Sequence, residues 1–561
     1  MTAASGSGHA AAQPLDATGT ARALVTALVA GGVREVVLAP GSRSAPFAYA
    51  LHEAEQAGWL RLYVRLDERG AGFLALGIAR ATGAPVAVVT TSGTAVANLH
   101  PAVLEAAHAG VPLLALTADR PHEMRGTGAN QTTDQVGLFG DAVRYAVDLP
   151  AAPQAGPGLT QVVTRALAAA CGSRSRDPGP VHLNVGLRDP LAPHDPWQPG
   201  APPARRAVVD APAALPPTPL RPGPRTVVVA GDGAGPAARA LAEQAGWPLL
   251  AEPTSGARTG PAAIGPYRAL LDHPELGGAV ERVVVMGHPT LSRPVSALLA
   301  RPDLEVVVVS PGGIWTDVAG TADRVVGAVT LEGTPEDPAW LDRWRLAAAA
   351  ASTVLDQHAD TAFDGLTVAR EVWRAGGVGA LVVGSSNPVR DLDLVAPPAT
   401  DPAPALANRG LAGIDGTVAT ATGVALGLGL PVRALLGDLT FLHDAGSLAR
   451  GSLERDVDLQ LVVVDDGGGA IFATLEHGAP QHAPAFERVF ATPQDVDLAR
   501  LAGAYGANHT PVTTAEQLTE VLAAPVRGRS VVTVPVDRTH LRRTRHGLAE
   551  DIARAVHAAL T

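Results

Sequence analysis

Two aspartates, Asp438 and Asp466, follow apolar runs at 432–436 and 459–464, where the sequence predicts the ends of two parallel strands. The 27 residues between the two aspartates leave room for a crossover helix and a return strand. Carboxylates from neighbouring strand ends, beside the glycine-rich turn 467–469, form an oxygen-rich site that suits a hard divalent cation. The amide groups of the turn, together with such a cation, predict a site for a diphosphate group.

Glu68 is the candidate acid–base group in the first part of the chain. It follows the apolar-aromatic run 60–64 and stands where a helix is expected to begin. A carboxyl group held there in an apolar pocket has a raised pKa and can exchange a proton with a nitrogen base. An acidic residue in a first helical turn also serves simply to complement the helix dipole. Taken alone, Glu68 leaves both interpretations open.

Further polar loops follow predicted strands at both ends of the chain. They are Pro40-Gly-Ser-Arg-Ser44, Thr90-Thr-Ser-Gly-Thr94, Leu116-Thr-Ala-Asp-Arg-Pro121, Gly128-Ala-Asn-Gln-Thr132, Gly384-Ser-Ser-Asn-Pro-Val-Arg390 and Asn408-Arg-Gly-Leu-Ala-Gly-Ile-Asp-Gly416. Open α/β sheets carry their ligand sites at this edge. The arginines in these loops are the residue type that binds carboxylates through two parallel hydrogen bonds.

Parallel sheets must position these loops. Short apolar runs alternate with Ala/Leu-rich helical stretches, at 35–38, 86–90, 111–116, 226–230, 282–286, 304–310, 380–383, 434–436, 459–464 and 530–534. Continuous apolar strands of this kind are typical of parallel sheets that are buried on both faces. The sequence therefore predicts an α/β protein with mainly parallel sheets.

Two shifts in composition divide the 561 residues. One is a proline-dense stretch after residue 189, and the other begins at residue 333 and continues as a helix. The predicted organisation is a disordered tail (1–17), three α/β domains (18–190, 220–332 and 362–561), a Pro-rich linker (191–219) and a linker that contains a helix (333–361).

Composition narrows the class of partner and the compartment. A net charge of −11 argues against nucleic acid or an anionic membrane surface as a partner. The single cysteine, Cys171, excludes an internal disulfide and a multi-cysteine metal site and suits the cytoplasm. No run of about eighteen apolar residues predicts a membrane span. The glycine-rich stretch 229–235 lacks the rest of a dinucleotide-binding fingerprint, so it is interpreted as part of a packed spacer.

Taken together, these motifs resemble those of the 2-succinyl-5-enolpyruvyl-6-hydroxy-3-cyclohexene-1-carboxylate synthases, a family of thiamine-diphosphate enzymes in menaquinone biosynthesis. The resemblance covers the first and third predicted domains almost end to end and the second weakly. It implies the thiamine-diphosphate-binding fold, in which a pyrimidine-binding domain, a central domain and a diphosphate-binding domain follow one another along the chain.

The resemblance assigns roles residue by residue. Glu68 is expected to activate the cofactor, and Ile414 to bend it. The expected ligands of Mg²⁺ (or Mn²⁺) are the side chains of Asp438 and Asp466 and the carbonyl of Gly468. The residues expected to bind thiamine diphosphate are Glu68, Gln131, Ile414, Gly437, Asp438, Asp466 and Gly468. The residues expected to bind substrates are Ser42, Arg43, Arg120, Gln131, Arg293, Ser386, Arg390, Arg409, Ile471, Phe472 and Leu475.

The reaction implied by the resemblance is decarboxylation of 2-oxoglutarate followed by conjugate addition of the succinyl carbanion equivalent to isochorismate. Both substrates carry two carboxylates, which gives a use for several fixed arginines. The resemblance also implies a transferase that assembles as a homodimer or as a homotetramer built as a dimer of dimers, with each active site between subunits.

Three positions depart from the family's pattern. Asp466 stands where the second metal ligand is usually asparagine, which adds a negative charge beside the diphosphate. Gly467 stands where some relatives have asparagine or aspartate, and a looser turn is expected there. Arg293 stands alone where relatives often present two adjacent basic residues.

Two other interpretations stay open at this point. One is an acetolactate-synthase-like enzyme or another 2-oxoacid decarboxylase of the same cofactor class, with FAD in the central domain. The other is a catalytically silent binding protein on the same fold. The joint presence of Glu68, Asp438 and Asp466 argues against the second interpretation.

Overall fold

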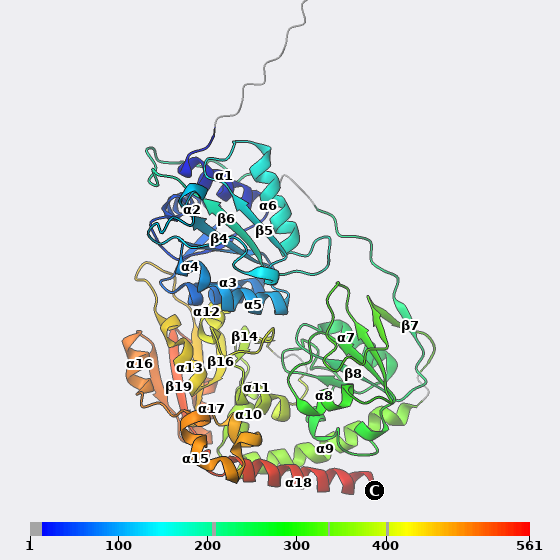
Figure 1. The fold of residues 1–561 in the computed structure, drawn as a ribbon. Coiled ribbons are helices and arrows are strands. Elements are labelled where there is room, and N and C mark those ends of the chain that lie inside the picture. Colours follow the sequence, from blue (N-terminus) through cyan, green and yellow to red (C-terminus); the bar gives the residue numbers. More distant parts are fainter. Residues whose placement is uncertain (1–13, 205–208, 335–336, 400–402) are drawn as a thin grey trace, which may run out of the picture. The chain divides into compact units, whose positions relative to one another are not determined.

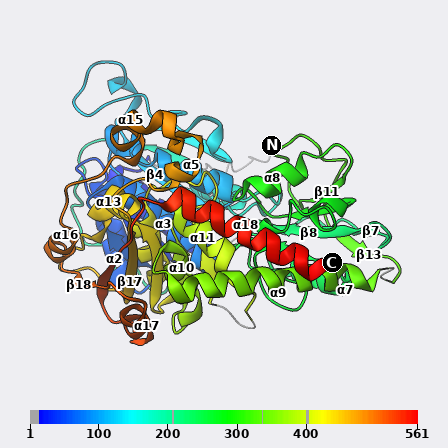
Figure 2. The same cartoon turned by 90° about the horizontal axis from the view of Figure 1, so that it is seen from below.

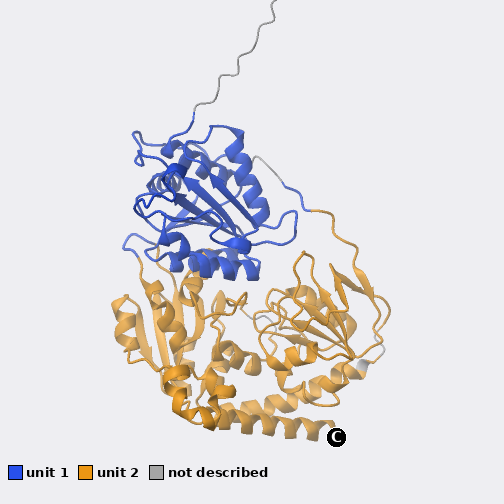
Figure 3. Ribbon diagram, viewed as in Figure 1, with its two compact units in different colours: residues 1–211, 451–454 blue, residues 212–450, 455–561 orange. Residues whose placement is uncertain are grey.

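The computed structural model describes residues 14–204, 209–334, 337–399 and 403–561 (Figure 1). The chain divides into two compact units, residues 1–211 with 451–454 and residues 212–450 with 455–561 (Figure 3). Of the tail predicted at 1–17, residues 1–13 lie outside the described residues. Pro14 forms an isolated bridge with Gln154, and Asp16 caps helix α1 (Ala17–Ala30) by accepting the N–H of Gly19.

The first unit contains a six-stranded sheet in the order β2–β1–β3–β4–β6–β5, with every pairing parallel. Its strands are β1 (Glu35–Leu38), β2 (Arg61–Val64), β3 (Val86–Thr90), β4 (Leu113–Asp119), β5 (Tyr145–Leu149) and β6 (Val181–Gly186). Helices α1, α2 (Ala45–Gln56) and α6 (Pro157–Ala170) cover one face, and α3 (Glu68–Thr82) and α5 (His100–Ala109) cover the other (Figure 1).

The second unit contains two larger sheets, both parallel. The five-stranded sheet has the order β12–β11–β10–β8–β9 and comprises β8 (Thr226–Ala230), β9 (Leu249–Ala251), β10 (Arg282–Met286), β11 (Glu305–Val309) and β12 (Arg324–Val326). The six-stranded sheet has the order β15–β14–β16–β17–β19–β18 and comprises β14 (Ala380–Val383), β15 (Ala405–Leu406), β16 (Val432–Gly437), β17 (Leu459–Asp465), β18 (Asn508–Pro511) and β19 (Arg529–Pro535). A two-stranded sheet pairs β7 (Thr218–Leu220) with β13 (Val329–Leu331).

Helices join these two larger sheets through a shared core. Helix α9 (Pro338–Thr361) lies alongside α18 (Leu541–Leu560), as Figure 2 shows. Trp344 of α9, fully buried, packs in one apolar cluster with strands of the five-stranded sheet and with Leu548 and Ile552 of α18. The second and third predicted domains therefore form one compact unit, and their division at 332 and 362 stays a proposal.

The predicted fold class is confirmed. Strands β1, β3, β8, β10 and β14 are buried at every residue, which is why their apolar runs are continuous. The helices that position the site in the second unit are α8 (Arg293–Leu299), α10 (Gly365–Ala375), α11 (Asn387–Val395), α12 (Thr417–Leu428), α13 (Asp438–Asp444) and α14 (Ile471–Thr474). In the described ranges, no helix is long and apolar enough to cross a membrane.

Candidate active site

Asp438 and Asp466 lie at the carboxyl ends of two adjacent strands. Strand β16 ends at Gly437 and α13 begins at Asp438, so no loop intervenes. Strand β17 ends one residue before Asp466, and the ladder pairs Gly437 with Val464. This parallel register places both aspartates at one edge of the sheet, as the sequence predicts.

The two carboxyl groups are largely withdrawn from water. Burial raises the pKa of Asp438 to about 6, against the opposing effect of the N–H groups of Leu439 and Gly468. Burial first, and then the charge of Asp438, raise the pKa of Asp466 to about 8. The Oδ1 atom of Asp466 is buried and has no hydrogen-bond partner among the described residues. Ionising both groups therefore requires positive charge from outside the pair.

Arg538 lies beside this pair but is already engaged. Its Nε donates to the carbonyl of Asp466 over 2.9 Å, and its two terminal nitrogens donate to Glu487, each over 2.8 Å. A buried carboxylate oxygen without a hydrogen-bond partner, beside a second carboxylate, suits an oxygen-preferring divalent cation. In the part of the chain that the structure describes, no three His, Cys, Asp or Glu side chains gather as a metal site. Diphosphate oxygens and water would have to complete the coordination.

The turn after β17 requires glycine at one position and permits asparagine at another. Gly468 has a φ of +142°, and a Cβ atom there would lie 2.3 Å from the carbonyl oxygen of Ala491. Gly467 has a φ of +69° with open space around it. Asparagine and aspartate adopt that conformation more readily than other side chains do. Asparagine or aspartate could therefore replace Gly467 without changing the turn.

Two predicted substrate arginines, Arg390 and Arg409, lie close together in the second unit. Burial first, and then the charge of Arg409, lower the pKa of Arg390. Arg409 is only 2% exposed, and its Nε and Nη1 atoms have no hydrogen-bond partner among the described residues. A buried guanidinium with unused donors is suited to bind a carboxylate.

Ser386 holds Arg390 from a strained position. Its backbone has a φ of +75°, which is unfavourable for a residue other than glycine, and it precedes α11 as the cap. The carbonyl of Ser386 accepts Nη1 of Arg390 over 2.8 Å. Strain of this kind collects at ligand sites, where the surrounding structure enforces it. Gln131, another predicted substrate residue, also has a positive φ (54°), so its backbone is strained in the same way.

Arg293 begins α8 and is paired with an acidic side chain. Its terminal nitrogens donate to the carboxylate of Glu476 over 2.6 and 3.2 Å, and both side chains are largely exposed. The positive charge of Arg293 nevertheless contributes to lowering the pKa of Arg390. Arg293 therefore lies near the arginine pair, with Glu476 holding its guanidinium.

The predicted apolar wall of the substrate pocket, Ile471, Phe472 and Leu475, follows the glycine-rich turn 467–469. Ile471 and Phe472 belong to α14, and with Leu475 they are partly exposed rather than buried. They therefore do not form a buried core face. Ile414 is also partly exposed, in the loop that precedes α12. Asn408 secures this loop by donating to the carbonyl of Asp415 over 3.3 Å.

The first unit holds a second pair of arginines, Arg43 and Arg120. They are 9% and 7% exposed, and burial, followed by the charge of Arg43, lowers the pKa of Arg120. Nη1 of Arg43 donates to the carbonyl of Leu187 over 2.8 Å and lies 3.5 Å from Asp189. Ser42, next to Arg43, is exposed.

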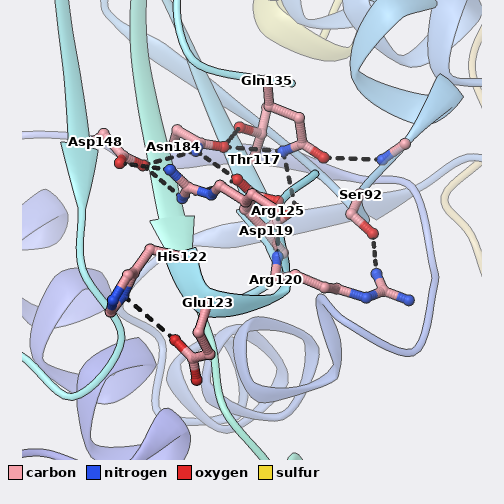
Figure 4. Close-up of polar contacts among 12 residues, drawn as sticks. Ser92, Thr117, Asp119, Arg120, His122, Glu123, Arg125, Gln135, Asp148 and Asn184 are labelled. Atoms are coloured by element: carbon pink, nitrogen blue, oxygen red, sulfur yellow. Dashed lines mark hydrogen bonds and ion pairs between the residues drawn. The ribbon is translucent and has the colours of Figure 1, made fainter. Parts of the chain in front are cut away.

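Buried polar side chains hold the loops around Arg120 (Figure 4). Ser92 accepts a hydrogen bond from Arg120 and donates to the carbonyl of Gln131 over 2.9 Å. The fully buried Gln135 accepts the N–H of Gly93 over 2.9 Å. It also donates to Asn184 over 2.9 Å and to the carbonyl of Ala118 over 3.2 Å.

Asp119 anchors the same group of loops from strand β4. This fully buried carboxylate accepts the backbone N–H of Arg120 over 2.7 Å and Nδ2 of Asn184 over 2.8 Å. It also pairs with Arg125 at 2.9 Å, and Arg125 in turn reaches Asp148 at 2.7 Å (Figure 4). Hydrogen bonds to charged groups are the stronger ones, so this network fixes the direction of Arg120.

Glu68 begins α3 immediately after the capping residue Asp67. It is partly exposed, and its Oε2 accepts Nδ2 of Asn98 over 3.3 Å. The strand-to-helix position predicted from sequence is confirmed. Enclosure of Glu68 in an apolar pocket stays a prediction, tied to an active site shared between subunits.

Several residues that hold the candidate site in place were not predicted from the sequence. Gln135 and Asn184 act through contacts across long sequence separations, and no motif marks them. Arg538 could have been found, because it follows β19 at the strand edge that already holds Asp438.

The glycines at 229–235 have a packing explanation. Gly231 donates to the carbonyl of Met286 over 2.9 Å, and a Cβ there would lie 2.0 Å from the nitrogen of Pro289. Asp232 and His288 exchange backbone hydrogen bonds of 3.3 and 2.9 Å. Close backbone approach between these two loops therefore accounts for Gly231, and positive φ angles of +75° and +70° account for Gly233 and Gly235.

Two segments of the chain match families of known proteins. Residues 18–138 match the family described as thiamine pyrophosphate enzyme, N-terminal TPP binding domain. Residues 396–536 match the C-terminal TPP binding domain of the same enzymes. Thiamine pyrophosphate is thiamine diphosphate, so the first match covers Glu68 and the second covers Asp438 and Asp466.

Curated relatives align with nearly the whole chain. A Nocardioides protein is 52% identical over 94% of this chain and 97% of its own length. A Kineococcus radiotolerans protein is 52% identical over 97% and 99%, and an Arthrobacter protein is 50% identical over 97% and 94%. All three carry the name 2-succinyl-5-enolpyruvyl-6-hydroxy-3-cyclohexene-1-carboxylate synthase. The chain therefore belongs to the 2-succinyl-5-enolpyruvyl-6-hydroxy-3-cyclohexene-1-carboxylate synthase family and is a thiamine-diphosphate-dependent transferase that forms a carbon–carbon bond.

Proposed function

We propose that this enzyme decarboxylates 2-oxoglutarate and transfers the remaining succinyl group to isochorismate, giving 2-succinyl-5-enolpyruvyl-6-hydroxy-3-cyclohexene-1-carboxylate for menaquinone biosynthesis. The name of the relatives supports the product. The observation that carries the choice of substrates is the pair of arginines in each unit, the buried Arg43 with Arg120 and the partly buried Arg390 with the buried Arg409. Two dicarboxylic substrates give each pair a partner.

Bound thiamine diphosphate supplies the electron sink that lets a 2-oxoacid lose CO₂. The side chains of Asp438 and Asp466 and the carbonyl of Gly468 would hold Mg²⁺ (or Mn²⁺), which would fix the diphosphate. Two observations support this metal site: the buried Oδ1 atom of Asp466 has no hydrogen-bond partner among the described residues, and the pKa of both carboxyl groups is raised. The carboxyl group of Glu68 would hold a proton at N1′ of the aminopyrimidine.

The remaining proposed roles concern orientation and the exclusion of water. The four arginines of the two pairs would form a polar lining, completed by Ser42, Gln131, Ser386 and Arg293. Ile471, Phe472 and Leu475 would form the apolar wall, and Ile414 would support the cofactor. Fixed arginines hold both substrates in one orientation, which a bimolecular addition requires.

The test compares donors in the presence of thiamine diphosphate, Mg²⁺ and isochorismate. We expect rapid CO₂ release and product formation with 2-oxoglutarate and at least a hundredfold lower rate with pyruvate, which lacks the second carboxylate. Equal use of pyruvate, or acetolactate as a product, would support the acetolactate-synthase-like alternative instead. Arg390→Lys should raise KM for a dicarboxylate, because lysine cannot form the two parallel hydrogen bonds.

Assembly and location belong to the same proposal. We propose a homodimer or a dimer of dimers with each active site between subunits, in the cytoplasm. Sedimentation equilibrium of the holoenzyme and fractionation of the source cells test these two points separately.

A further inference from the structure

Glu252 is a buried carboxyl group with no part in the proposed chemistry. It directly follows β9 in the five-stranded sheet and is 2% exposed. Its Oε1 accepts the backbone N–H of Leu291 over 2.9 Å. Its Oε2 is buried and has no hydrogen-bond partner among the described residues. Placing a carboxyl group there costs stability, so an explanation for it is required.

The loop that Glu252 holds also contacts a substrate arginine. Thr290 directly precedes Leu291, and its hydroxyl oxygen accepts Nη2 of Arg409 over 3.3 Å. Two consecutive residues thus connect Glu252 to Arg409. Leu291 contacts Glu252 through its backbone N–H, and Thr290 contacts Arg409 through its side chain. The connection crosses from the five-stranded sheet to the loop that precedes α12.

The charge state of Glu252 suits a positioning role. Burial raises its pKa to about 8, with a smaller raising effect from Asp393, and Arg409 acts in the opposite direction. At neutral pH the group therefore mostly keeps its proton. A protonated carboxyl group can still accept the N–H of Leu291, and it leaves the positive charge of Arg409 available for a substrate carboxylate.

The same segment secures the second arginine of the unit. Arg258, 2% exposed, donates to the carbonyls of Asp393 and Ala396 over 2.9 and 2.7 Å. It also lies 3.4 Å from the side chain of Asp393. Asp393 belongs to α11, the helix that carries Arg390. The chain from Glu252 to Arg258 thus contacts the supports of both Arg390 and Arg409.

We propose that Glu252 is a positioning residue for substrate binding, acting through Leu291 and Thr290 to hold the guanidinium of Arg409 toward a substrate carboxylate. The five-stranded sheet thereby takes part in recognising the dicarboxylic substrate. This inference rests on the proposed function, because Arg409 has this role only if a substrate presents a carboxylate.

The test uses steady-state kinetics of the holoenzyme with each substrate varied in turn. Arg409→Lys first identifies which KM depends on Arg409. Glu252→Ala removes the acceptor of the Leu291 N–H, Glu252→Gln keeps it, and Thr290→Val removes the acceptor of Arg409 at nearly constant volume. Glu243→Ala is the matched control, since that exposed glutamate of the same region pairs only with Arg239 at 2.8 Å in the described contacts.

We expect Glu252→Ala and Thr290→Val to raise the same KM as Arg409→Lys by about tenfold, with kcat changed less than about threefold. Glu252→Gln and Glu243→Ala should keep the wild-type KM. The double variant Glu252→Ala/Thr290→Val should be no worse than the more impaired single variant, because both act on one contact.

Three outcomes overturn the inference: an unchanged KM in Glu252→Ala, additive effects in the double variant, or a rise in the KM that Arg409→Lys leaves unaffected. If Glu252→Ala does not fold, Glu252→Asp replaces it, because its shorter side chain withdraws the acceptor from the Leu291 N–H, and an unchanged KM in that variant overturns the inference. A wild-type enzyme that is inactive with 2-oxoglutarate and isochorismate contradicts the proposed function instead, so the two failures are distinguishable.

Discussion

Asp438 and Asp466 show at the scale of single residues how folding prepares a site for an ion. Each carboxyl group is placed by the end of a strand, and burial raises the pKa of both. Ionising both would place two negative charges together in a medium of low polarity, which is costly without a cation. If a cation binds here as proposed, the relief of this cost would add to its affinity.

Asp466→Asn tests this cost. In the presence of EDTA at pH 8, the variant should unfold at a higher temperature, with a gain of about 1–2 kcal/mol, because one of two buried like charges is removed. Asparagine keeps an oxygen ligand, so activity at saturating Mg²⁺ should persist. Differential scanning calorimetry measures the first effect, with Asp465→Asn, at a partly exposed neighbour, as control. A metal-free variant less stable than wild type contradicts the account.

Glu252 gives a pH dependence of stability. Its folded pKa of about 8 lies above the ordinary value of 4.5, so the folded state binds the proton more tightly than the unfolded chain does. The contribution to stability is therefore fully present below pH 4.5 and is lost as pH rises through 8. Between pH 5 and pH 8, wild type should lose on the order of 3 kcal/mol more than Glu252→Gln. Urea unfolding at each pH measures the difference, and parallel curves would show that Glu252 titrates normally.

At the scale of elements, the glycine-rich turn 467–469 contains two glycines with different conformational requirements. Gly468→Ala should abolish cofactor binding, because its Cβ would overlap the Ala491 carbonyl, 2.3 Å away. Gly467→Asn should bind the cofactor within about threefold of wild type, since asparagine tolerates this conformation and the space is open. Titration of thiamine diphosphate by protein fluorescence measures both. Tight binding by Gly468→Ala would mean that the turn is built differently.

Sequence predicts the strands with continuous apolar runs well, and the strands that are interrupted by polar residues or exposed poorly. Strands β1, β3 and β10 occupy the predicted residues, because burial on both faces leaves a continuous apolar run. Strand β6 was missed, since His182 and Asn184 interrupt its apolar pattern while serving the buried polar network. The edge strand β18 has no buried residue, so no apolar run marks it.

The positions of Asp438, Asp466 and Glu68 after strands were predictable, because each follows an apolar run in the sequence. Their roles in binding metal and cofactor stay predictions. Glu252 was not predictable, because its partner Leu291 is 39 residues away in sequence and the contact is to a backbone group. Local sequence carries no signal for a hydrogen bond whose partner is fixed only by the packing of two sheets.

At the scale of the whole molecule, the proposed assembly makes each active site depend on two chains. If Glu68 serves the diphosphate site of a partner subunit, Glu68→Gln and Asp438→Ala should each be inactive alone and complement each other when mixed. A mixed dimer has one site with both groups intact and one with neither. A preparation of mixed dimers should therefore have about half of wild-type activity.

The mixing experiment uses the two variants carrying different affinity tags, co-expressed and purified through both tags. Wild-type chains prepared in the same way are the control. A mixed dimer that stays inactive, although wild type survives the procedure, would place each Glu68 with the diphosphate site of its own chain.

The central claim is that this chain joins the succinyl part of 2-oxoglutarate to isochorismate with thiamine diphosphate and uses Glu68 to do so. The most direct measurement is product formation from ¹³C-labelled 2-oxoglutarate and isochorismate, followed by mass spectrometry, for wild type and Glu68→Gln. The account predicts a labelled succinyl adduct with wild type and a rate at least about a hundredfold lower with the variant. A variant that keeps most of the activity, or a wild type that releases CO₂ without forming the adduct, would contradict it.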